Sequence, residues 1–176
     1  CAVAFCALVG GQDELIFDGG SFVVDHDGEL IARAPQFEEH LLIAEVDPQA
    51  AASARLRDTR RRPAARAFRE DIHHLGSFTV RDGEHESPGA PHGEITPMLE
   101  RCAEIYQALV LGTRDYVEKN GFRQVVIGLS GGVDSTLVAL IAVDALGADR
   151  VTTVTMPSPY SSSGTKGDAH HLAGNL

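Results

Sequence analysis

The chain has 176 residues, of which 43% are apolar, and its formal net charge is −10. This length suffices for one ordinary domain or for parts of two, and the apolar fraction is typical of globular proteins. The negative charge argues against broad binding to nucleic-acid phosphates, and no apolar run approaches the ~20 residues that cross a bilayer.

The first fifty residues have the pattern of short strands. Residues 2–9 (AVAFCALV) form a nearly continuous apolar run, which is typical of a strand buried on both faces. We expect Gly10-Gly11 to end it. Two extended runs, SFVVD at 21–25 and ELIAR at 29–33, then predict a hairpin whose positive φ angles fall at Asp27-Gly28. Residues 40–46 (HLLIAEV) predict one more strand, closed by Asp47-Pro48.

Residues 51–95 have the composition of a linker. They are rich in Ala and Arg, then in Gly, Pro, His and charged residues, and few large apolar side chains recur at any period. We interpret the arginines between 55 and 62 as a solvated, partly helical face, not as a nucleic-acid site. The pairs His73-His74 and His170-His171 have no Cys or carboxylate at zinc-ligand spacing, so no metal site is predicted there.

Residues 96–176 regain a helical and strand period. Thr96 as N-cap and Pro97 in the first turn predict a helix that ends at Asn120-Gly121. One face of that helix carries Leu99, Cys102, Ile105, Tyr106, Leu109 and Tyr116.

The pattern after this helix alternates between strand and helix. A strand is predicted at 124–129 (QVVIGL), a helix at 134–146 capped by Gly147, and a strand at 151–155 (VTTVT). A third helix is expected to open at Thr165 and Asp168, which have capping-box spacing. This order indicates the start of a parallel α/β sheet.

One short segment between strand and helix carries the chemistry. The stretch contains Gly128, Leu129, Ser130, Gly131, Gly132, Val133, Asp134 and Ser135. The paired glycines let main-chain amides approach an anion, and the N-terminus of the following helix attracts a phosphate. Ser130 and Ser135 add hydroxyl donors. Asp134 is repelled by a polyphosphate, so we predict it to be a ligand of Mg²⁺.

A plain strand-to-helix turn is the alternative interpretation of this segment. It is not a Walker loop, because no GxxxxGK[ST] pattern is present, and it is not GxGxxG. The six residues SGGVDS resemble the SGGxDS loop of the ATP-pyrophosphatase superfamily. Within that group, YQALVLGTRDY at 106–116 and MPSPYSS at 156–162, with Thr165 and Asp168-Ala169, resemble bacterial glutamine-dependent NAD synthetases. Thr165 stands where family patterns often have Ser.

A further resemblance lies near the start of the chain. VGGQDELIFDG at 9–19 resembles the late part of the nitrilase-type glutaminase domain of the same family. The resemblance implies the end of a nitrilase-like α/β sandwich at 1–50, a linker at 51–95, and at 96–176 the start of a parallel-sheet ATP-pyrophosphatase domain, similar to the adenine-nucleotide alpha-hydrolases. Gln12, Asp13 and Glu14 are expected to shape the glutaminase part or its contact with the synthetase.

The resemblance also implies an activity. Such enzymes are ligases that use ATP and Mg²⁺ to adenylate deamido-NAD, and ammonia from glutamine then displaces AMP to give NAD. They are homo-oligomers when full length. The three cysteines show no CxxC spacing, no signal peptide is recognised, and we expect a cytoplasmic protein without nucleic-acid or membrane partners.

The chain is expected to be a fragment, because it lacks an initiator Met and ends within a pattern. No catalytic residue is assigned in it. Cys6 is predicted to be a buried structural thiol, the glutaminase nucleophile is expected upstream of residue 1, and the isolated fragment is expected to be inactive. Three alternatives stay open: another SGGxDS adenylating amidotransferase of the GMP-synthetase type, a non-catalytic ATP-binding fragment, and a stand-alone nitrilase-type amidase.

Overall fold

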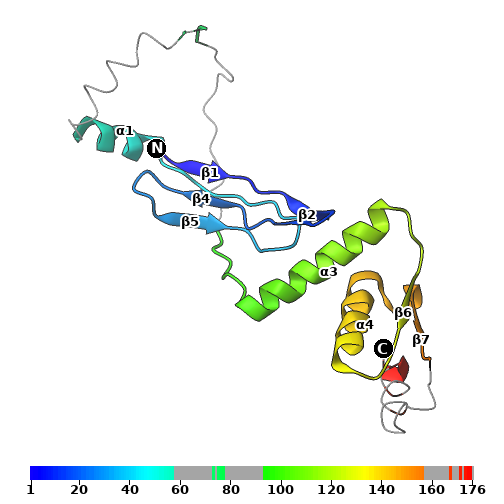
Figure 1. The fold of residues 1–176 in the computed structure, drawn as a ribbon. Helices are drawn as coiled ribbons and strands as arrows, with labels where there is room; N and C mark the ends of the chain where they lie inside the picture. Colours follow the sequence, from blue (N-terminus) through cyan, green and yellow to red (C-terminus); the bar gives the residue numbers. More distant parts are fainter. Residues whose placement is uncertain are drawn as a thin grey trace. The chain divides into compact units, whose positions relative to one another are not determined.

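The computed structural model describes residues 1–57, 73, 75–77, 93–156, 167, 171 and 173–175. The chain divides into two compact units that each combine separate segments. The first unit comprises Cys1–Cys6, Ser21–Ala34 and His40–Thr96, and the second comprises Ala7–Gly20, Pro35–Glu39 and Pro97–Leu176. Figure 1 shows their elements in chain order.

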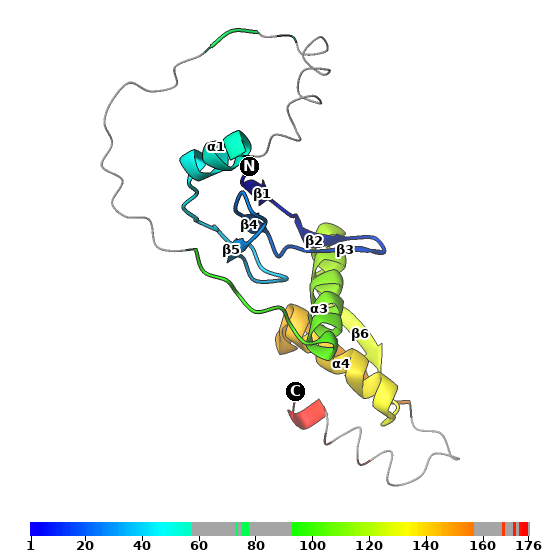
Figure 2. The same ribbon diagram turned by 90° about the vertical axis from the view of Figure 1, so that its left-hand side faces the viewer.

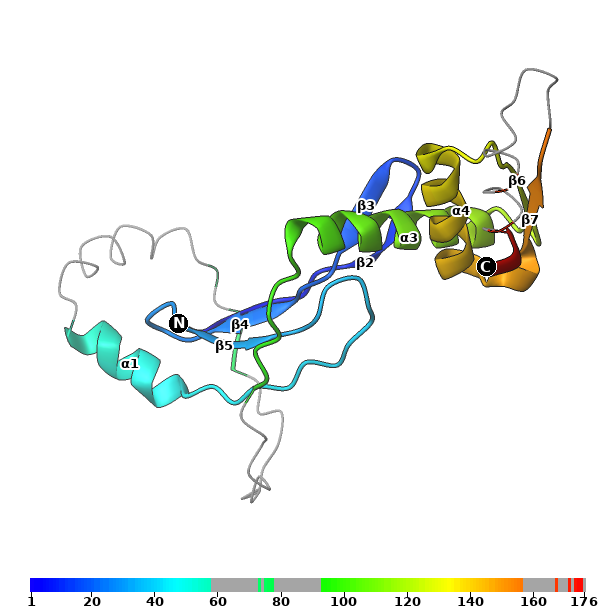
Figure 3. The same cartoon turned by 90° about the horizontal axis from the view of Figure 1, so that it is seen from below.

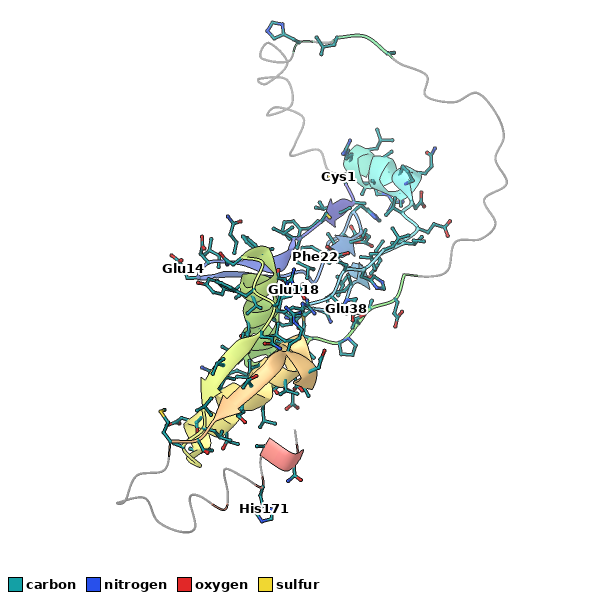
Figure 4. All side chains as sticks on the ribbon, turned by 90° about the vertical axis from the view of Figure 1, so that its right-hand side faces the viewer. Cys1, Glu14, Phe22, Glu38, Glu118 and His171 are labelled. Atoms are coloured by element: carbon teal, nitrogen blue, oxygen red, sulfur yellow. The ribbon has the colours of Figure 1, made fainter. Side chains whose placement is uncertain are left out.

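The first unit contains a three-stranded antiparallel sheet. Its strands are β1 (Val3–Phe5), β4 (Phe22–Val24) and β5 (Leu30–Arg33), in the order β1-β4-β5. The rings of Phe5 and Phe22 stack with their centroids 5.3 Å apart, and Figure 4 labels Phe22 on this sheet. The predicted strand at 2–9 is therefore wrong in extent and burial, since β1 holds three exposed residues.

The β4–β5 hairpin confirms one prediction and corrects a detail. Asp25 Oδ1 accepts the amides of Asp27 at 2.8 Å and Glu29 at 2.9 Å, so one side chain organises the turn. The hydrogen bond from the Glu29 amide has the largest effect on the pKa of Asp25. Together with the bond from Asp27 it lowers this pKa despite the opposing effect of desolvation. Gly28 has a φ of 91°, but the predicted positive φ at Asp27 is not found.

The strand expected at residues 40–46 is absent, and a helix follows this segment. Residues 40–46 form no strand and Leu41 is 81% exposed, since no strand in the described part of the chain pairs with this segment. Asp47 Oδ1 instead accepts the amides of Gln49 and Ala50 and caps helix α1 (Pro48–Arg57). The described part of the predicted linker is thus partly helical, and residues 58–72, 74 and 78–92 of it lie outside the described residues.

The second unit begins with a two-stranded hairpin that we did not predict as such. Strands β2 (Val9–Gln12) and β3 (Leu15–Asp18) pair antiparallel, with Gln12 opposite Leu15. The turn contains no glycine, and Asp13 itself adopts a φ of 51°. Gly10-Gly11 was expected to break the strand, but both glycines lie buried within β2.

Helix α3 (Arg101–Lys119) follows, with Asn120 as its C-cap and Gly121 at a φ of 74°, which confirms the predicted end. The predicted start at Thr96-Pro97 is wrong. The amide of Thr96 donates to the carbonyl of Arg33 at 3.0 Å, and Arg33 Nε donates to the Thr96 carbonyl at 2.7 Å. These bonds hold Thr96 beside β5, so the helix begins only at Arg101.

The remaining elements form a parallel α/β arrangement, as predicted. Strand β6 (Val125–Gly128) leads through a loop to helix α4 (Val133–Leu146), and the 3₁₀ turn η2 (Ala148–Arg150) leads to strand β7 (Val151–Val154). β6 and β7 pair in parallel, and Figure 1 shows α4 beside them. Gly147, with a φ of 88°, caps α4 as expected.

Two small clusters of buried side chains hold these elements together. Val117 of α3 packs with Ala145 and Leu146 of α4, and Leu129 packs with Ala139. On the predicted apolar face of α3, by contrast, Ile105, Leu109 and Tyr116 are about half exposed, at 51%, 47% and 55%. In the described parts of the chain, no helix has the length and apolar character needed to span a membrane.

Candidate functional site

The predicted phosphate loop lies between β6 and α4. The amide of Leu129 donates to the carbonyl of Val154 at 2.9 Å, which extends the β6–β7 pairing by one residue. The Leu129 side chain is only 2% exposed and packs on Ala139 of α4. Leu129 therefore fixes the β6 end of the loop against β7 and α4, and its own amide is already engaged.

The backbone of the loop turns at its two glycines. Gly131 adopts a φ of 83°, a conformation that favours glycine. Gly132 is the N-cap of α4 and has an extended conformation, with no side chain capping the helix among these fully described residues. The amides of the first helical turn have no partner within a helix, so they stay available to an anion placed at this end.

Two serine hydroxyls tie the loop to itself. Ser130 Oγ and Ser135 Oγ lie 3.0 Å apart, and Ser135 Oγ donates to the carbonyl of Gly132 at 3.1 Å. The amide of Gly132 donates to Ser130 Oγ at 3.3 Å. A Cβ added at Gly132 would lie 3.4 Å from Ser130 Oγ, which is an ordinary contact distance, so of the two glycines only Gly131, with its positive φ, has a conformation that favours glycine. The geometry fixes where both hydroxyls lie before any ligand binds.

The first turn of α4 carries the loop's only acid. Asp134 is exposed, and its neighbour Val133 is 80% exposed. The donor set near this turn consists of main-chain amides and serine hydroxyls for an anion, and one carboxylate for a hard cation. This set fits a magnesium-bound polyphosphate.

The predicted site residues form one continuous segment of the structure, but they contribute to the loop in different ways. Ser130, Gly131, Gly132 and Ser135 make or shape the loop, whereas Gly128 lies in β6 and Leu129 acts through its buried side chain. Residues 157–162, Thr165 and Asp168-Ala169, which carry part of the family resemblance, lie outside the described residues, as do His74 and His170.

The cysteines need one correction. Cys1, Cys6 and Cys102 are free and exposed. The predicted burial of Cys6 is wrong, because Cys6 follows a strand, β1, whose own residues are exposed, and is itself exposed.

A cavity of about 480 Å³ lies elsewhere in the second unit, between the β2–β3 hairpin and α3. No residue of the loop lines it. Its lining is mostly apolar and carries one ionisable acid, Asp13, which makes it unsuited to a polyphosphate. The lining residues are Asp13, Ile16, Ile105, Ala108, Leu109, Gly112, Thr113, Tyr116 and Val117.

Sequence reasoning missed a charged pair on α3 beside this hairpin. Asp115 and Lys119 are one helical turn apart, with Lys119 Nζ 3.0 Å from Asp115 Oδ2. Their i,i+4 spacing is visible in the sequence, but their contact with the hairpin is not.

Two family models match separate parts of the chain. The carbon-nitrogen hydrolase family matches residues 1–56, and the NAD synthase family matches residues 105–176. The chain therefore joins a segment of the carbon-nitrogen hydrolase type to one of the NAD synthase type.

Single relatives match both segments at once. The chain is 44% identical to the glutamine-dependent NAD(+) synthetase of Thermotoga maritima over 99% of its length, and 47% identical to that of Aquifex aeolicus over 100%. It also matches the structure of the glutamine-dependent NAD+ synthetase from Acinetobacter baumannii in complex with ADP, with a TM-score of 0.73 and 39% identity, covering 99% of this chain and 26% of that one.

Over its whole length the chain is therefore similar to one part of the glutamine-dependent NAD(+) synthetases. It spans about 30% of the length of the Thermotoga and Aquifex relatives.

Proposed function

We propose that the protein containing this chain converts deamido-NAD to NAD, using ATP and ammonia derived from glutamine. The observation that carries the proposal is the similarity to glutamine-dependent NAD synthetases along the whole chain. The SGGVDS loop at the start of α4 supports it, because this loop presents the donors that an ATP-dependent step requires.

The proposed chemistry has two steps. A carboxylate oxygen of deamido-NAD attacks the α-phosphorus of ATP, and pyrophosphate leaves. Ammonia then attacks the acyl carbon of the adenylate, and AMP leaves to give the amide. Ammonia itself comes from hydrolysis of glutamine to glutamate in the hydrolase-type part.

We assign the loop to the pyrophosphate of ATP. The amides at the start of α4 would bind its oxygens, and so would the hydroxyls of Ser130 and Ser135 once their protons turn from each other and from the Gly132 carbonyl. Gly131 and Gly132 would let the backbone approach these oxygens. Asp134 would hold Mg²⁺, which offsets the charge of the phosphates. Stabilising the leaving pyrophosphate in this way favours attack on the α-phosphorus. The ADP complex of the Acinetobacter relative supports adenine-nucleotide binding.

The domain assignment stands as part of this proposal. Residues 1–50 would belong to the glutaminase-type domain, 51–95 to the linker and 96–176 to the ATP-binding domain, which agrees with the family matches at 1–56 and 105–176. A GMP-synthetase-like activity is disfavoured by the match to the carbon-nitrogen hydrolase family. From the family resemblance we also expect a cytoplasmic homo-oligomer.

The test measures AMP, pyrophosphate and NAD made by the full-length protein from ATP, with and without deamido-NAD, given glutamine or ammonia. We expect release of AMP and pyrophosphate that depends on deamido-NAD and equals the NAD formed. Asp134→Asn should lower the rate at least about 100-fold, the scale of losing one key electrostatic contact, and Asp149→Asn, an exposed acid outside the loop, should not. AMP release with another acid but not with deamido-NAD would refute the family activity.

A further inference from the structure

By sequence, the β2–β3 hairpin lies in the segment that matches one family. In the structure, it packs on a helix of the segment that matches the other. Residues 9–18 lie inside the carbon-nitrogen hydrolase match, whereas α3 falls almost entirely in the NAD synthase match. Both nevertheless form part of the second compact unit. Figures 2 and 3 show the hairpin crossing α3, and Figure 4 labels Glu14 at its tip.

Glycines let the hairpin approach the helix closely. A Cβ added at Gly11 would lie 3.0 Å from Gly112 Cα, and one added at Gly112 would lie 2.6 Å from Ile16 Cδ1. A larger residue at Gly11 would meet the backbone of α3 and push the two elements apart, whereas at Gly112 it would meet only the movable end of the Ile16 side chain. The contact thus brings the backbone of β2 directly onto that of α3.

Two side chains of α3 hold both main-chain groups of Gly11. Asp115 Oδ2 accepts the Gly11 amide at 2.8 Å, and Lys119 Nζ donates to the Gly11 carbonyl at 2.6 Å. The Asp115 side chain is only 16% exposed. Hydrogen bonds to charged groups are stronger than neutral ones, and more so where water is excluded. We call this set, Gly11 with Asp115 and Lys119, the hairpin clamp.

The other side of α3 contacts the helix that carries the phosphate loop. Tyr106 donates its hydroxyl hydrogen bond to Asp144 of α4 at 2.6 Å, and Val117 packs on Ala145 and Leu146. α3 therefore touches a hydrolase-family hairpin on one side and the loop-bearing α4 on the other.

We propose that the hairpin clamp fastens the glutaminase-type part to the synthetase-type part and thereby couples glutamine hydrolysis to amide formation. This inference rests on the function proposed above. Ammonia released from glutamine must reach the adenylate before it is lost to solvent, so a fixed attachment between the two parts raises the fraction captured. Asp115 and Lys119 are positioning residues in this scheme and touch no substrate.

The experiment uses the full-length protein and its Asp115→Asn and Lys119→Met variants. NAD formation is measured with glutamine and, separately, with ammonia, and glutamate is measured beside NAD. We expect glutamine-driven NAD formation to fall at least about fivefold, as follows from losing a charge-assisted hydrogen bond. Ammonia-driven formation should stay within about twofold of wild type, and glutamate should exceed NAD. Glu118→Gln, an acid on the same helix that contacts Arg150 and not the hairpin, is the matched control.

The outcomes separate the hypotheses. An unchanged ratio of glutamine-driven to ammonia-driven NAD formation overturns the clamp proposal, whereas absence of NAD from either nitrogen source in the wild type overturns the proposed function. If both rates of Asp115→Asn fall together, Gly11→Ala decides, since its added Cβ meets the backbone of α3 at Gly112 Cα, 3.0 Å away, without removing a charge. An equal loss of both rates in Gly11→Ala as well would show that the contact is structural only and would overturn the proposal.

Discussion

The carboxylate of Asp115 accepts the main-chain amide of Gly11 at 2.8 Å, across 104 positions of sequence. Desolvation acts to raise the pKa of Asp115, but the hydrogen bond from Gly11 and the charges of Lys119 and Arg114 together outweigh it. The pKa of Asp115 is therefore lower than that of an ordinary aspartate. The attachment of the hairpin to α3 is consequently linked to pH.

The first prediction follows from this linkage. A carboxyl group whose pKa is lowered on folding adds stability above its unfolded pKa, about 3.9 for Asp, and loses it as pH falls through the folded value. At pH 7 we expect the free energy of opening of residues 9–18 to be about 1–3 kcal/mol lower in Asp115→Asn than in wild type. The difference should shrink below about pH 4. Amide hydrogen exchange of the full-length proteins, corrected for intrinsic rates, measures it. An equal difference at pH 3 and pH 7 would contradict the assignment.

The second prediction concerns the loop hydroxyls. Ser135→Ala removes the oxygen that lies 3.0 Å from Ser130 Oγ and donates to the carbonyl of Gly132. We expect kcat/KM for ATP to fall about 10- to 100-fold, the range of one to two hydrogen bonds to a charged ligand, with ΔG of unfolding changed by less than about 1 kcal/mol. Steady-state kinetics with varied ATP measure the loss. Ser53→Ala, at an exposed position of α1, serves as the control, and similar kinetics for both variants would refute the role.

The third prediction concerns the bond between α3 and α4. Tyr106 of α3 donates a hydrogen bond to Asp144 of α4. This hydrogen bond raises the pKa of Tyr106, and desolvation and the charge of Asp144 raise it further. A raised pKa adds stability below the unfolded value, about 10, and loses it as pH rises through the folded value. Tyr106→Phe should thus lower the free energy of unfolding by about 0.5–1.5 kcal/mol at pH 7 and by less above pH 10. Denaturant titrations at both pH values test this, with Tyr116→Phe on the same helix as the comparison.

Sequence reasoning succeeded where the signals are local. The segment from β6 to β7 was predicted within one residue at each boundary, because an apolar run, two turn glycines and a helix capped by Gly147 all lie within thirty-odd residues of one another. The eight predicted site residues form one contiguous segment from the end of β6 to the start of α4, and their role in nucleotide binding stays a prediction. Their roles still differ, since only the coordinates show that the amide of Leu129 is engaged by Val154.

The failures share a physical cause, which is contact between distant segments. Thr96 has a good N-cap side chain, but its backbone is bonded to Arg33, 63 residues earlier, and the helix starts later. Gly10-Gly11 has the composition of a strand end, but α3 supplies partners for the backbone of Gly11 and keeps the strand intact. The β2–β3 turn escaped notice because Asp13 adopts the positive φ that a glycine would have signalled.

The separation of Gly11 from Asp115 has a consequence for the order in which the protein is made. A ribosome adds about 5–20 residues per second, so the hairpin emerges roughly 5–20 s before its partner on α3 exists. During that interval the edge of β2 is unprotected, and an isolated two-stranded hairpin is marginally stable in water. Translation speed between the two segments, and any chaperone that covers the nascent hairpin, should therefore affect the yield of folded protein.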